Sequence, residues 1–365
     1  MKRISLGVML LCLNTAAQGV EIIDTGIIVQ EKGMTRSSIH WWDNDNLLVA
    51  GVQAARPPTD RSGWRLLRYK PSEKSVTDMG QVGALCVSNE HIRLSRLSPE
   101  SVGKPFSDWK YTLFSGSIDK IVEEPPRHPT PPSPNPPSFN ELSNCKFPDE
   151  LPISPWLEAA KKSGRLFTAL RPEHGWAEME YAQLPEGSPD KFKGMHPVRI
   201  YPPGNSEQAK SVEGLEQIDL GSIWPYFAFK NAYLLDELPR VTPRTTGFVR
   251  TWWLYPDGHV EPALQYDRAI RRGDTRWAWA ENVFIPTREG FLLVYERLYS
   301  RAPLANVKTG LYRYQPDGNF TKVASGGIEG FAVSPDGCRV AFGADDSYRD
   351  GRSQYALKII DVCKN

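Results

Sequence analysis

The amino-acid sequence predicts an all-β fold, and three observations lead to this prediction. First, 31 of the 365 residues are proline, about 8–9% against a typical ~5%. Helix interiors and central strands hold little proline, so most of it must lie in turns and loops. Second, short apolar runs preceded by tight turns recur along the chain. Third, the N-terminal part of the chain contains a predicted strand that belongs to none of the recurring units. Together they predict a six-bladed β-propeller of four-stranded antiparallel blades, closed by that N-terminal strand pairing with the C-terminal blade.

Residues 1–19 are predicted to be a signal peptide. Lys2 and Arg3 provide a positive start, Ile4 to Leu13 form a short apolar run, and small residues up to Gly19 suit cleavage. The run is too short to cross a bilayer. The alternative is a buried strand or helix at the N-terminus. No later stretch is apolar enough to be a transmembrane helix.

The remaining residues, 20–365, are predicted to form one propeller domain of six repeat units. Each unit begins with two short apolar strands joined by a tight turn. These turns lie at 43–46, 88–91, 162–165, 229–232, 287–290 and 334–337. A second hairpin follows each of the first five units, and its turn often holds Pro followed by Asp and Gly. Two hairpins make a four-stranded blade.

The sixth unit ends after a third strand, predicted at Tyr355 to Val362. The N-terminal strand, Val20 to Val29, is expected to pair with it and to complete the blade. Closure of this kind removes two exposed sheet edges. In the third unit, Trp156 to Lys162 is predicted as either one short helix turn or the first strand. That unit also carries the longest excursion, Arg171 to Pro197.

The segment from Phe331 to Phe342, FAVSPDGCRVAF, resembles the WD-like repeat of the TolB propeller family. The resemblance covers about one blade and is degenerate in the other five. It implies a TolB-like six-bladed fold. It does not imply the Tol-system function, because the propeller pattern starts straight after the predicted signal peptide and leaves no room for an N-terminal α/β domain.

Four cysteines remain once the signal peptide and Cys12 are removed, and an even number in an exported protein suggests two disulfides. Four cysteines allow three pairings. The predicted fold favours Cys338–Cys363 and Cys86–Cys145. In the first pair the two strands would place residue 343 opposite 358, with a loop near 345–354. The alternative is four free buried thiols.

A proline-rich insertion, residues 123–139, reads EEPPRHPTPPSPNPPSF. Such a segment is expected to be extended polyproline II. It is either a docking segment for an aromatic groove or a semi-rigid spacer.

Five loops predicted between the second and third strands of their blades are rich in Arg and Pro, and such loops share one face of a propeller with the blade-to-blade connections. The candidate binding residues are Arg56, Arg61, Arg171, Trp176, Arg240, Arg244, Arg301, Arg349 and Arg352. Guanidinium groups suit carboxylates and phosphates, and Arg and Trp are favoured at protein interfaces. Alternatively, Asp60, Glu173 and Asp350 neutralise these arginines as solvated pairs.

Motifs of common catalytic sites are missing from the sequence: it has no GxSxG, HExxH, P-loop or GxGxxG. The six histidines are dispersed, although His174 and His196 share one excursion.

Some six-bladed propellers are calcium-dependent lactonases or esterases with acids in the central channel. The inner strands here are instead predicted to present small residues and the tryptophans Trp41, Trp224, Trp277 and Trp279. The candidate acids are Asp43, Asp274 and Glu281, too few to predict a calcium site.

The 44 Lys and Arg residues balance 43 Asp and Glu residues, for a net charge of +1, which argues against nucleic acid as a partner. We therefore predict an exported protein-interaction or scaffold module, periplasmic or secreted, that has no cofactor and binds a protein or peptide through its arginine-rich face. The alternative is a calcium-dependent propeller hydrolase. An anionic glycan or small ligand at the same face is a third possibility, and its binding would weaken at high salt.

Overall fold

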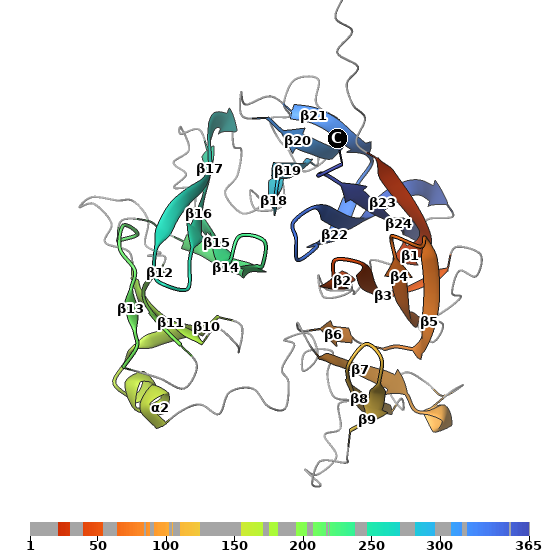
Figure 1. Ribbon diagram of the computed structural model, residues 1–365, viewed down its shortest axis with the longest axis horizontal. Helices are drawn as coiled ribbons and strands as arrows, with labels where there is room; N and C mark the ends of the chain where they lie inside the picture. Colours follow the sequence, from red (N-terminus) through yellow and green to blue (C-terminus); the bar gives the residue numbers. More distant parts are fainter. Residues whose placement is uncertain are drawn as a thin grey trace, which may run out of the picture.

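The computed structural model describes the chain in segments, all of them shown in colour in Figure 1. The described residues are 21–29, 39–53, 64–83, 85–87, 91–101, 104, 110–124, 155–170, 175–181, 195–202, 207–216, 218, 220–237, 247–270, 282–295, 308–315, 320–349 and 352–364. They form a nearly all-β protein, as predicted. No helix within these ranges is long and apolar enough to cross a membrane.

The strands follow one another in antiparallel meanders of four, in which consecutive strands pair. Group 1 contains β2 (Ile39–Asp43), β3 (Asn46–Gln53), β4 (Arg65–Lys70) and β5 (Ser75–Gln81). Group 2 contains β6 (Leu85–Val87), β7 (Ile92–Leu97), β8 (Tyr111–Gly116) and β9 (Ile121–Glu123), with the short 3-10 helix η3 (Pro99–Ser101) after β7. Group 3 contains β10 (Leu166–Ala169), β11 (Trp176–Tyr181), β12 (Met195–Tyr201) and β13 (Lys210–Ser211), preceded by helix α2 (Pro155–Lys162).

The second half of the chain repeats this arrangement. Group 4 contains β14 (Leu220–Phe227), β15 (Ala232–Glu237), β16 (Gly247–Leu254) and β17 (Val260–Ile270). Group 5 contains β18 (Asn282–Thr287), β19 (Gly290–Tyr295), β20 (Gly310–Tyr314) and β21 (Phe320–Ser325). Group 6 contains β22 (Ile328–Val333), β23 (Arg339–Arg349), β24 (Arg352–Asp361) and the N-terminal strand β1 (Ile22–Val29).

Strand β1 pairs antiparallel with β24, in a register that includes Ile22 opposite Ile360 and Val29 opposite Tyr355. The pairing of the N-terminal strand with the last group is thus as predicted. Its side chains alternate between exposed and buried positions, as expected for a strand with one face against a core. Strand β1 also pairs briefly with β3, through Ile27 and Ile28, and so joins groups 6 and 1 into one sheet.

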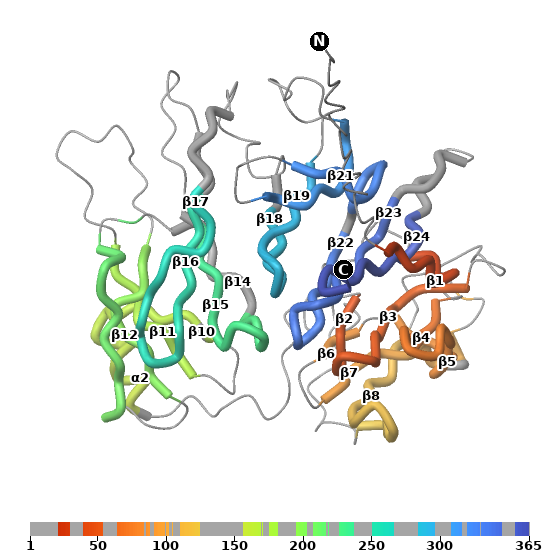
Figure 2. The backbone as a smooth tube through the Cα atoms, turned by 45° about the horizontal axis from the view of Figure 1, so that its top comes forward, coloured from red at the N-terminus to blue at the C-terminus, as the bar shows by residue number. Residues whose placement is uncertain are grey.

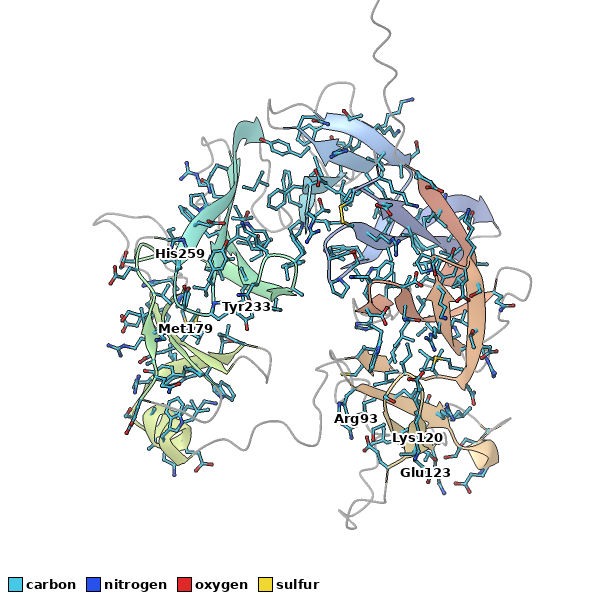
Figure 3. The ribbon with its side chains drawn as sticks, in the orientation of Figure 1. Arg93, Lys120, Glu123, Met179, Tyr233 and His259 are labelled. Atoms are coloured by element: carbon cyan, nitrogen blue, oxygen red, sulfur yellow. A yellow bond between two sulfur atoms is a disulfide. The ribbon has the colours of Figure 1, made fainter. Side chains whose placement is uncertain are left out.

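Hydrophobic cores lie between neighbouring groups. Five clusters connect groups 6 and 1, 1 and 2, 3 and 4, 4 and 5, and 5 and 6. Met179 of β11 and Tyr233 of β15, for example, belong to the cluster between groups 3 and 4 (Figure 3). Within the described residues, no such cluster joins group 2 to group 3. The groups form an arc around a common centre, with groups 2 and 3 at its two ends (Figure 1).

Group 3 differs from its prediction. The segment Trp156 to Lys162, predicted as either a helix turn or a strand, belongs to helix α2, whose Leu157 and Ala160 are buried. The turn at 162–165 therefore connects a helix to β10, and β10 is the first strand of its group instead of the second. The predicted long excursion, Arg171 to Pro197, contains strand β11.

The last hairpin is longer than predicted, and its register differs by one residue. Gly343 lies opposite Leu357 instead of residue 358, and Val362 N donates a hydrogen bond to Cys338 O. The Cys338–Cys363 disulfide is present, with 5.2 Å between its Cα atoms. Because Cys338 lies opposite Val362, the disulfide joins diagonal positions. The loop predicted at 345–354 is mostly strand, since β23 extends to Arg349 and β24 begins at Arg352.

Two further predictions lie largely outside the described residues. Of the proline-rich insertion, only Glu123 and Glu124 are described, and Glu123 ends strand β9. Cys86 lies in the first strand of group 2, as predicted, and is disulfide-bonded. Its predicted partner, Cys145, is outside the described ranges, so the Cys86–Cys145 pairing stays a prediction.

Candidate functional site

Most of the predicted arginine-rich face belongs to connections between second and third strands. Since consecutive strands are antiparallel, these connections leave their sheets at the same end. Arg56 and Arg61 belong to the β3–β4 connection, Arg240 and Arg244 to the β15–β16 connection, and Arg301 to the β19–β20 connection. All five residues lie outside the described ranges.

The β23–β24 hairpin supplies the last two arginines of this face. Arg349 and Arg352 lie opposite each other in the strand register, at the tip of the hairpin. Strands β22, β23, β24 and β1 lie side by side in group 6 (Figure 2). The fold therefore brings these two positions together, although only their backbone is described.

Arg171 and Trp176 do not belong to a second-to-third connection, which corrects their predicted place. Because β10 is the first strand of group 3, the β10–β11 connection that contains Arg171 joins strands one and two. Trp176 is the first residue of β11 and lies half-buried, with Lys161 Nζ 4.7 Å from its ring centroid. These two residues are thus at the opposite end of their sheet from a second-to-third connection.

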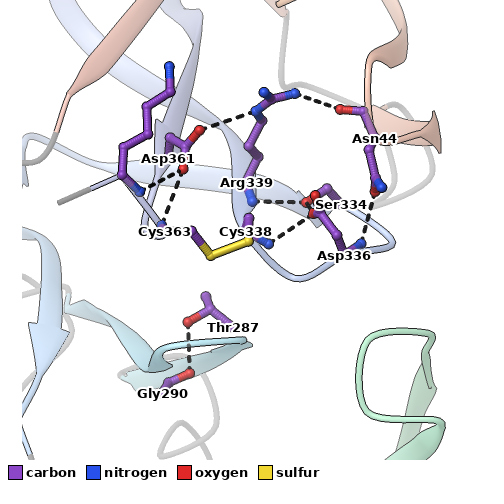
Figure 4. Close-up of a disulfide and its surroundings, with 10 residues drawn as sticks. Asn44, Thr287, Gly290, Ser334, Asp336, Cys338, Arg339, Asp361 and Cys363 are labelled. Atoms are coloured by element: carbon purple, nitrogen blue, oxygen red, sulfur yellow. Dashed lines mark hydrogen bonds and ion pairs between the residues drawn. A yellow bond between two sulfur atoms is a disulfide. The ribbon is translucent and has the colours of Figure 1, made fainter.

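Turns between first and second strands gather at that opposite end, around the β22–β23 turn (Figure 4). Asp336 N donates to Asn44 Oδ1 at 2.9 Å, and Arg339 Nη1 donates to Asn44 O at 2.6 Å, which ties group 6 to group 1. Arg288 N donates to Gly337 O at 2.9 Å, which ties group 5 to group 6. We call these contacts the turn cluster.

Glycine is required at one position of the turn cluster. Gly337 has a φ of +74°, and a Cβ atom there would lie 2.5 Å from the Phe229 ring of the β14–β15 turn. The Ser334-Pro335-Asp336-Gly337 sequence supplies this geometry, with proline early and glycine at the left-handed position. Turns of groups 4, 5 and 1 thus contact the β22–β23 turn of group 6.

Three acidic side chains beside the turn cluster, Asp361, Asp45 and Asp43, are engaged in contacts within the protein. Asp361 Oδ2 accepts from Arg339 Nε at 3.3 Å, and its Oδ1 accepts from Cys363 N at 3.2 Å. Burial acts to raise the pKa of Asp45, but hydrogen bonds from Ser72 and the charge of Arg339 hold it below its usual value. Asp43, one of the predicted channel acids, accepts from Asp45 N and Asn46 Nδ2 within its own turn.

A second polar cluster lies on group 3 beside helix α2. The Glu178 carboxylate is only 6% exposed and accepts from Arg165 Nε and Nη2, each at 2.5 Å. Tyr201 Oη donates to the same carboxylate at 2.9 Å, and Arg199 Nη1 donates at 3.4 Å. The hydrogen bonds from Arg165 lower the pKa of Glu178 against the opposing effect of burial, and Tyr201 lowers it further.

Aromatic rings surround this cluster. The Trp156 ring of α2 lies 4.9 Å from Tyr201 and 6.0 Å from Phe167, measured between ring centroids. Arg165 Cζ lies 5.3 Å from the centroid of Phe167. Cations over aromatic faces gain about 0.5–1 kcal/mol at exposed sites. Helix α2 is therefore held to the sheet by ring contacts as well as by ion pairs.

Sequence reasoning missed both this cluster and a second buried ion pair. Arg93 Nε donates to Glu124 Oε1 at 2.7 Å, and both side chains are under 10% exposed. The available signal was a charged residue flanked by buried apolar ones, such as Ile92-Arg93-Leu94 and Ala177-Glu178-Met179.

Metal ligands do not gather within the described ranges, where no group of three or more His, Cys, Asp or Glu side chains is placed to hold an ion. Asp274, Glu281, His174, Trp277 and Trp279 are outside the described residues, so the channel alternative stays a prediction. Trp41 belongs to β2 and donates from Nε1 to Ala332 O at 3.1 Å, between groups 1 and 6. Trp224 belongs to β14, where only its backbone is described.

Acid is expected to destabilise the protein in two steps. His196 is 3% exposed, and burial lowers its pKa below the ordinary 6.5. The pKa of Glu178 is lowered from 4.5. A group whose pKa is lower in the folded than in the unfolded protein favours the fold at pH values above its unfolded pKa. That contribution is lost as the pH falls. The melting temperature should therefore begin to fall below pH 6.5, because His196 then binds a proton more readily in the unfolded chain than in the folded protein, and fall more steeply below 4.5.

The variant His196→Phe isolates the first step. It should abolish the fall between pH 6.5 and 5, while the exposed His259→Phe, a matched control, should retain it. A fall of equal size in both variants would contradict the role of His196. The measurement is a series of thermal melts from about pH 7 to pH 4.

Comparison with known proteins gives no matching family model and no matching curated protein. Solved structures similar to the chain include the β-propeller domain of the trilobed protease from Pyrococcus furiosus, at 8% identity and a TM-score of 0.30, covering 85% of this chain and 79% of that one. The β-propeller domain of Swd1 from Myceliophteria thermophila has 12% identity and a TM-score of 0.30, covering 89% and 83%. A gluconolactonase from Xanthomonas campestris has 9% identity and a TM-score of 0.31, covering 94% and 96%. The fold described above rests on the strand pairings of this chain and not on these likenesses.

Proposed function

We propose that the protein is an exported six-bladed β-propeller that binds a protein partner through the arginine-bearing connections between second and third strands. In this proposal groups 1 to 6 are the blades, and β1 closes the ring by completing group 6. The protein resides in the periplasm or outside the cell after removal of residues 1–19. The disulfide and the position of β1, just after the predicted cleavage site, support this.

The observation that carries the proposal is that the two kinds of connection leave the sheets at opposite ends. The first-to-second turns of groups 1, 5 and 6 contact one another in the turn cluster through hydrogen bonds. The connections between second and third strands leave from the other end and carry the arginines. Arg349 and Arg352 lie opposite each other in the backbone register of one such hairpin. Guanidinium groups suit carboxylates on a partner surface.

A pull-down from periplasmic extract tests the proposed face. The test variant replaces four arginines of two connections with glutamine: Arg56, Arg61, Arg240 and Arg244. The partner recovered by the unaltered protein should be reduced by about tenfold or more, since interface arginines are frequent hot spots.

A second variant with the same change in charge serves as the control. It replaces four lysines that lie elsewhere on the described surface with glutamine: Lys74, Lys120, Lys210 and Lys322. Recovery should be unchanged in this control. Equal recovery with the test variant would remove the proposed face. N-terminal sequencing of the exported protein checks the cleavage at residue 19, and a start at Met1 would refute export.

A further inference from the structure

A cationic and aromatic surface lies on one sheet face of group 3. The strand register places Phe167, Glu178 and Arg199 in one cross-strand row, so these side chains share a face. Helix α2 packs beside this face through Trp156. We call this region the α2 surface, and define it by Trp156, Lys161, Arg165, Phe167, Trp176 and Arg199.

The α2 surface has more hydrogen-bond donors than acceptors. Glu178 and Tyr201 are the acceptors in its centre. The two Glu178 oxygens already receive four donated bonds, and Tyr201 Oη accepts one from Arg165 Nη2 at 2.6 Å. Each guanidinium has five N–H donors, and the side chains of Arg165 and Arg199 are 37% and 51% exposed while Glu178 is 6% exposed. Trp156 Nε1 is buried and has no hydrogen-bond partner among the described residues. A carboxylate-bearing ligand would supply the acceptors that this cluster lacks.

Positive charge also exceeds negative charge at the solvent boundary of this surface. Lys161 and Lys162 end helix α2 and are exposed, and they join the two half-exposed arginines. Among the described residues of α2 and β11, the exposed acids are Glu158 and Glu180. Because Glu178 is enclosed by its donors, the described part of this surface offers an approaching ligand four cations and two acids.

Ring faces and edges lie next to these cations. Trp156 and Phe167 are half-buried, and the Lys161 ammonium lies over the Trp176 ring. Such rings offer flat apolar contact area at little cost in conformational entropy, which is typical of protein-recognition sites. A phosphate ion alone would leave this area unused.

We propose that the α2 surface binds an acidic peptide segment that also carries apolar side chains, presented by a protein partner. Its carboxylates accept hydrogen bonds from Arg165 and Arg199, and its apolar side chains pack on Trp156 and Phe167. This second surface rests on the proposed function only in that the partner is a protein. It shares no residue with the arginines altered in the pull-down, so either surface can fail independently of the other.

The test uses the mature protein and a labelled peptide of alternating glutamate and phenylalanine, with binding followed by fluorescence anisotropy. The peptide should bind, and the double variant Lys161→Gln/Arg199→Gln should weaken binding by about tenfold. A peptide with glutamine in place of glutamate should bind at least about tenfold more weakly. Raising the salt concentration from about 50 mM to about 500 mM should also weaken binding of the peptide.

The matched control is Arg313→Gln/Lys322→Gln, which makes the same change of charge on strands β20 and β21. It should bind as the unaltered protein does. Both variants should keep the same melting temperature within a few degrees, since Arg199 contacts Glu178 only at 3.4 Å from a half-exposed side chain and the other three side chains are exposed or half-buried. Absence of peptide binding would overturn the proposal, as would an equal loss in both variants. Preferential binding of anionic lipid vesicles or of free inorganic phosphate would also overturn it.

Discussion

Replacing Arg165 with methionine is expected to lower the free energy of unfolding by about 3 kcal/mol. The substitution leaves the buried Glu178 carboxylate without its two shortest hydrogen bonds. Removing one partner of a buried pair costs about 3–5 kcal/mol because the remaining charge is uncompensated. The lower end applies here, since Arg165 is itself 37% exposed and Tyr201 still donates to Glu178. Urea denaturation at neutral pH measures the change.

Two further variants separate the ion pair from general damage. Arg199→Met removes a longer contact of 3.4 Å from a half-exposed side chain, and it should cost less than about 1 kcal/mol. Arg165→Met/Glu178→Leu removes both charges and should recover most of the loss, because a buried pair and an apolar replacement are often equally stable. An Arg165→Met variant as stable as Arg199→Met would contradict the prediction.

Replacing both Cys338 and Cys363 with serine is expected to lower the free energy of unfolding by about 3 kcal/mol. The disulfide spans 25 residues of sequence, so its loss enlarges the unfolded ensemble. The measurement is urea denaturation without reductant, which leaves the disulfide of Cys86 intact.

The position of the loss provides an independent check on this prediction. The disulfide joins the start of β23 to the end of β24, and β24 in turn holds β1. Hydrogen exchange in the serine variant should therefore speed up most in β1 and β24, and least in β18 and β19 of group 5. A uniform increase across all groups would contradict a local role for the disulfide.

Much of the strand arrangement was predictable because it depends on neighbouring residues. The Ser334–Gly337 turn has proline, aspartate and glycine where its backbone requires them, and the 43–46 and 287–290 turns also join their predicted strands. The pairing of β1 with β24 followed from counting strands. These features arise from turn chemistry and side-chain alternation within a few residues.

The α2 segment and the buried ion pairs were less accessible to sequence reasoning. Eight residues that contain Trp156, Leu157 and Ala160 fit a helix as well as a short strand, and packing against β10–β12 decides between them. Arg93 and Glu124 are 31 residues apart in sequence, and Arg165 and Glu178 are 13 apart. The apolar neighbours of Arg93 and Glu178 are a local sign of burial, but nothing local in the sequence states which partner each charge meets.

By itself the sequence determined the all-β class, the recurring hairpins, the strand that joins the last group, and the Cys338–Cys363 pair. Only the tertiary structure decided the one-residue register of β23 and β24, the helix before group 3, the end of the sheet to which Trp176 belongs, and the arginines that enclose Glu178. The physical reason is the distance along the sequence over which each interaction acts. Turns and side-chain alternation are set by interactions between near neighbours, whereas register, burial of charge and partner choice depend on the surface that distant strands present to each other.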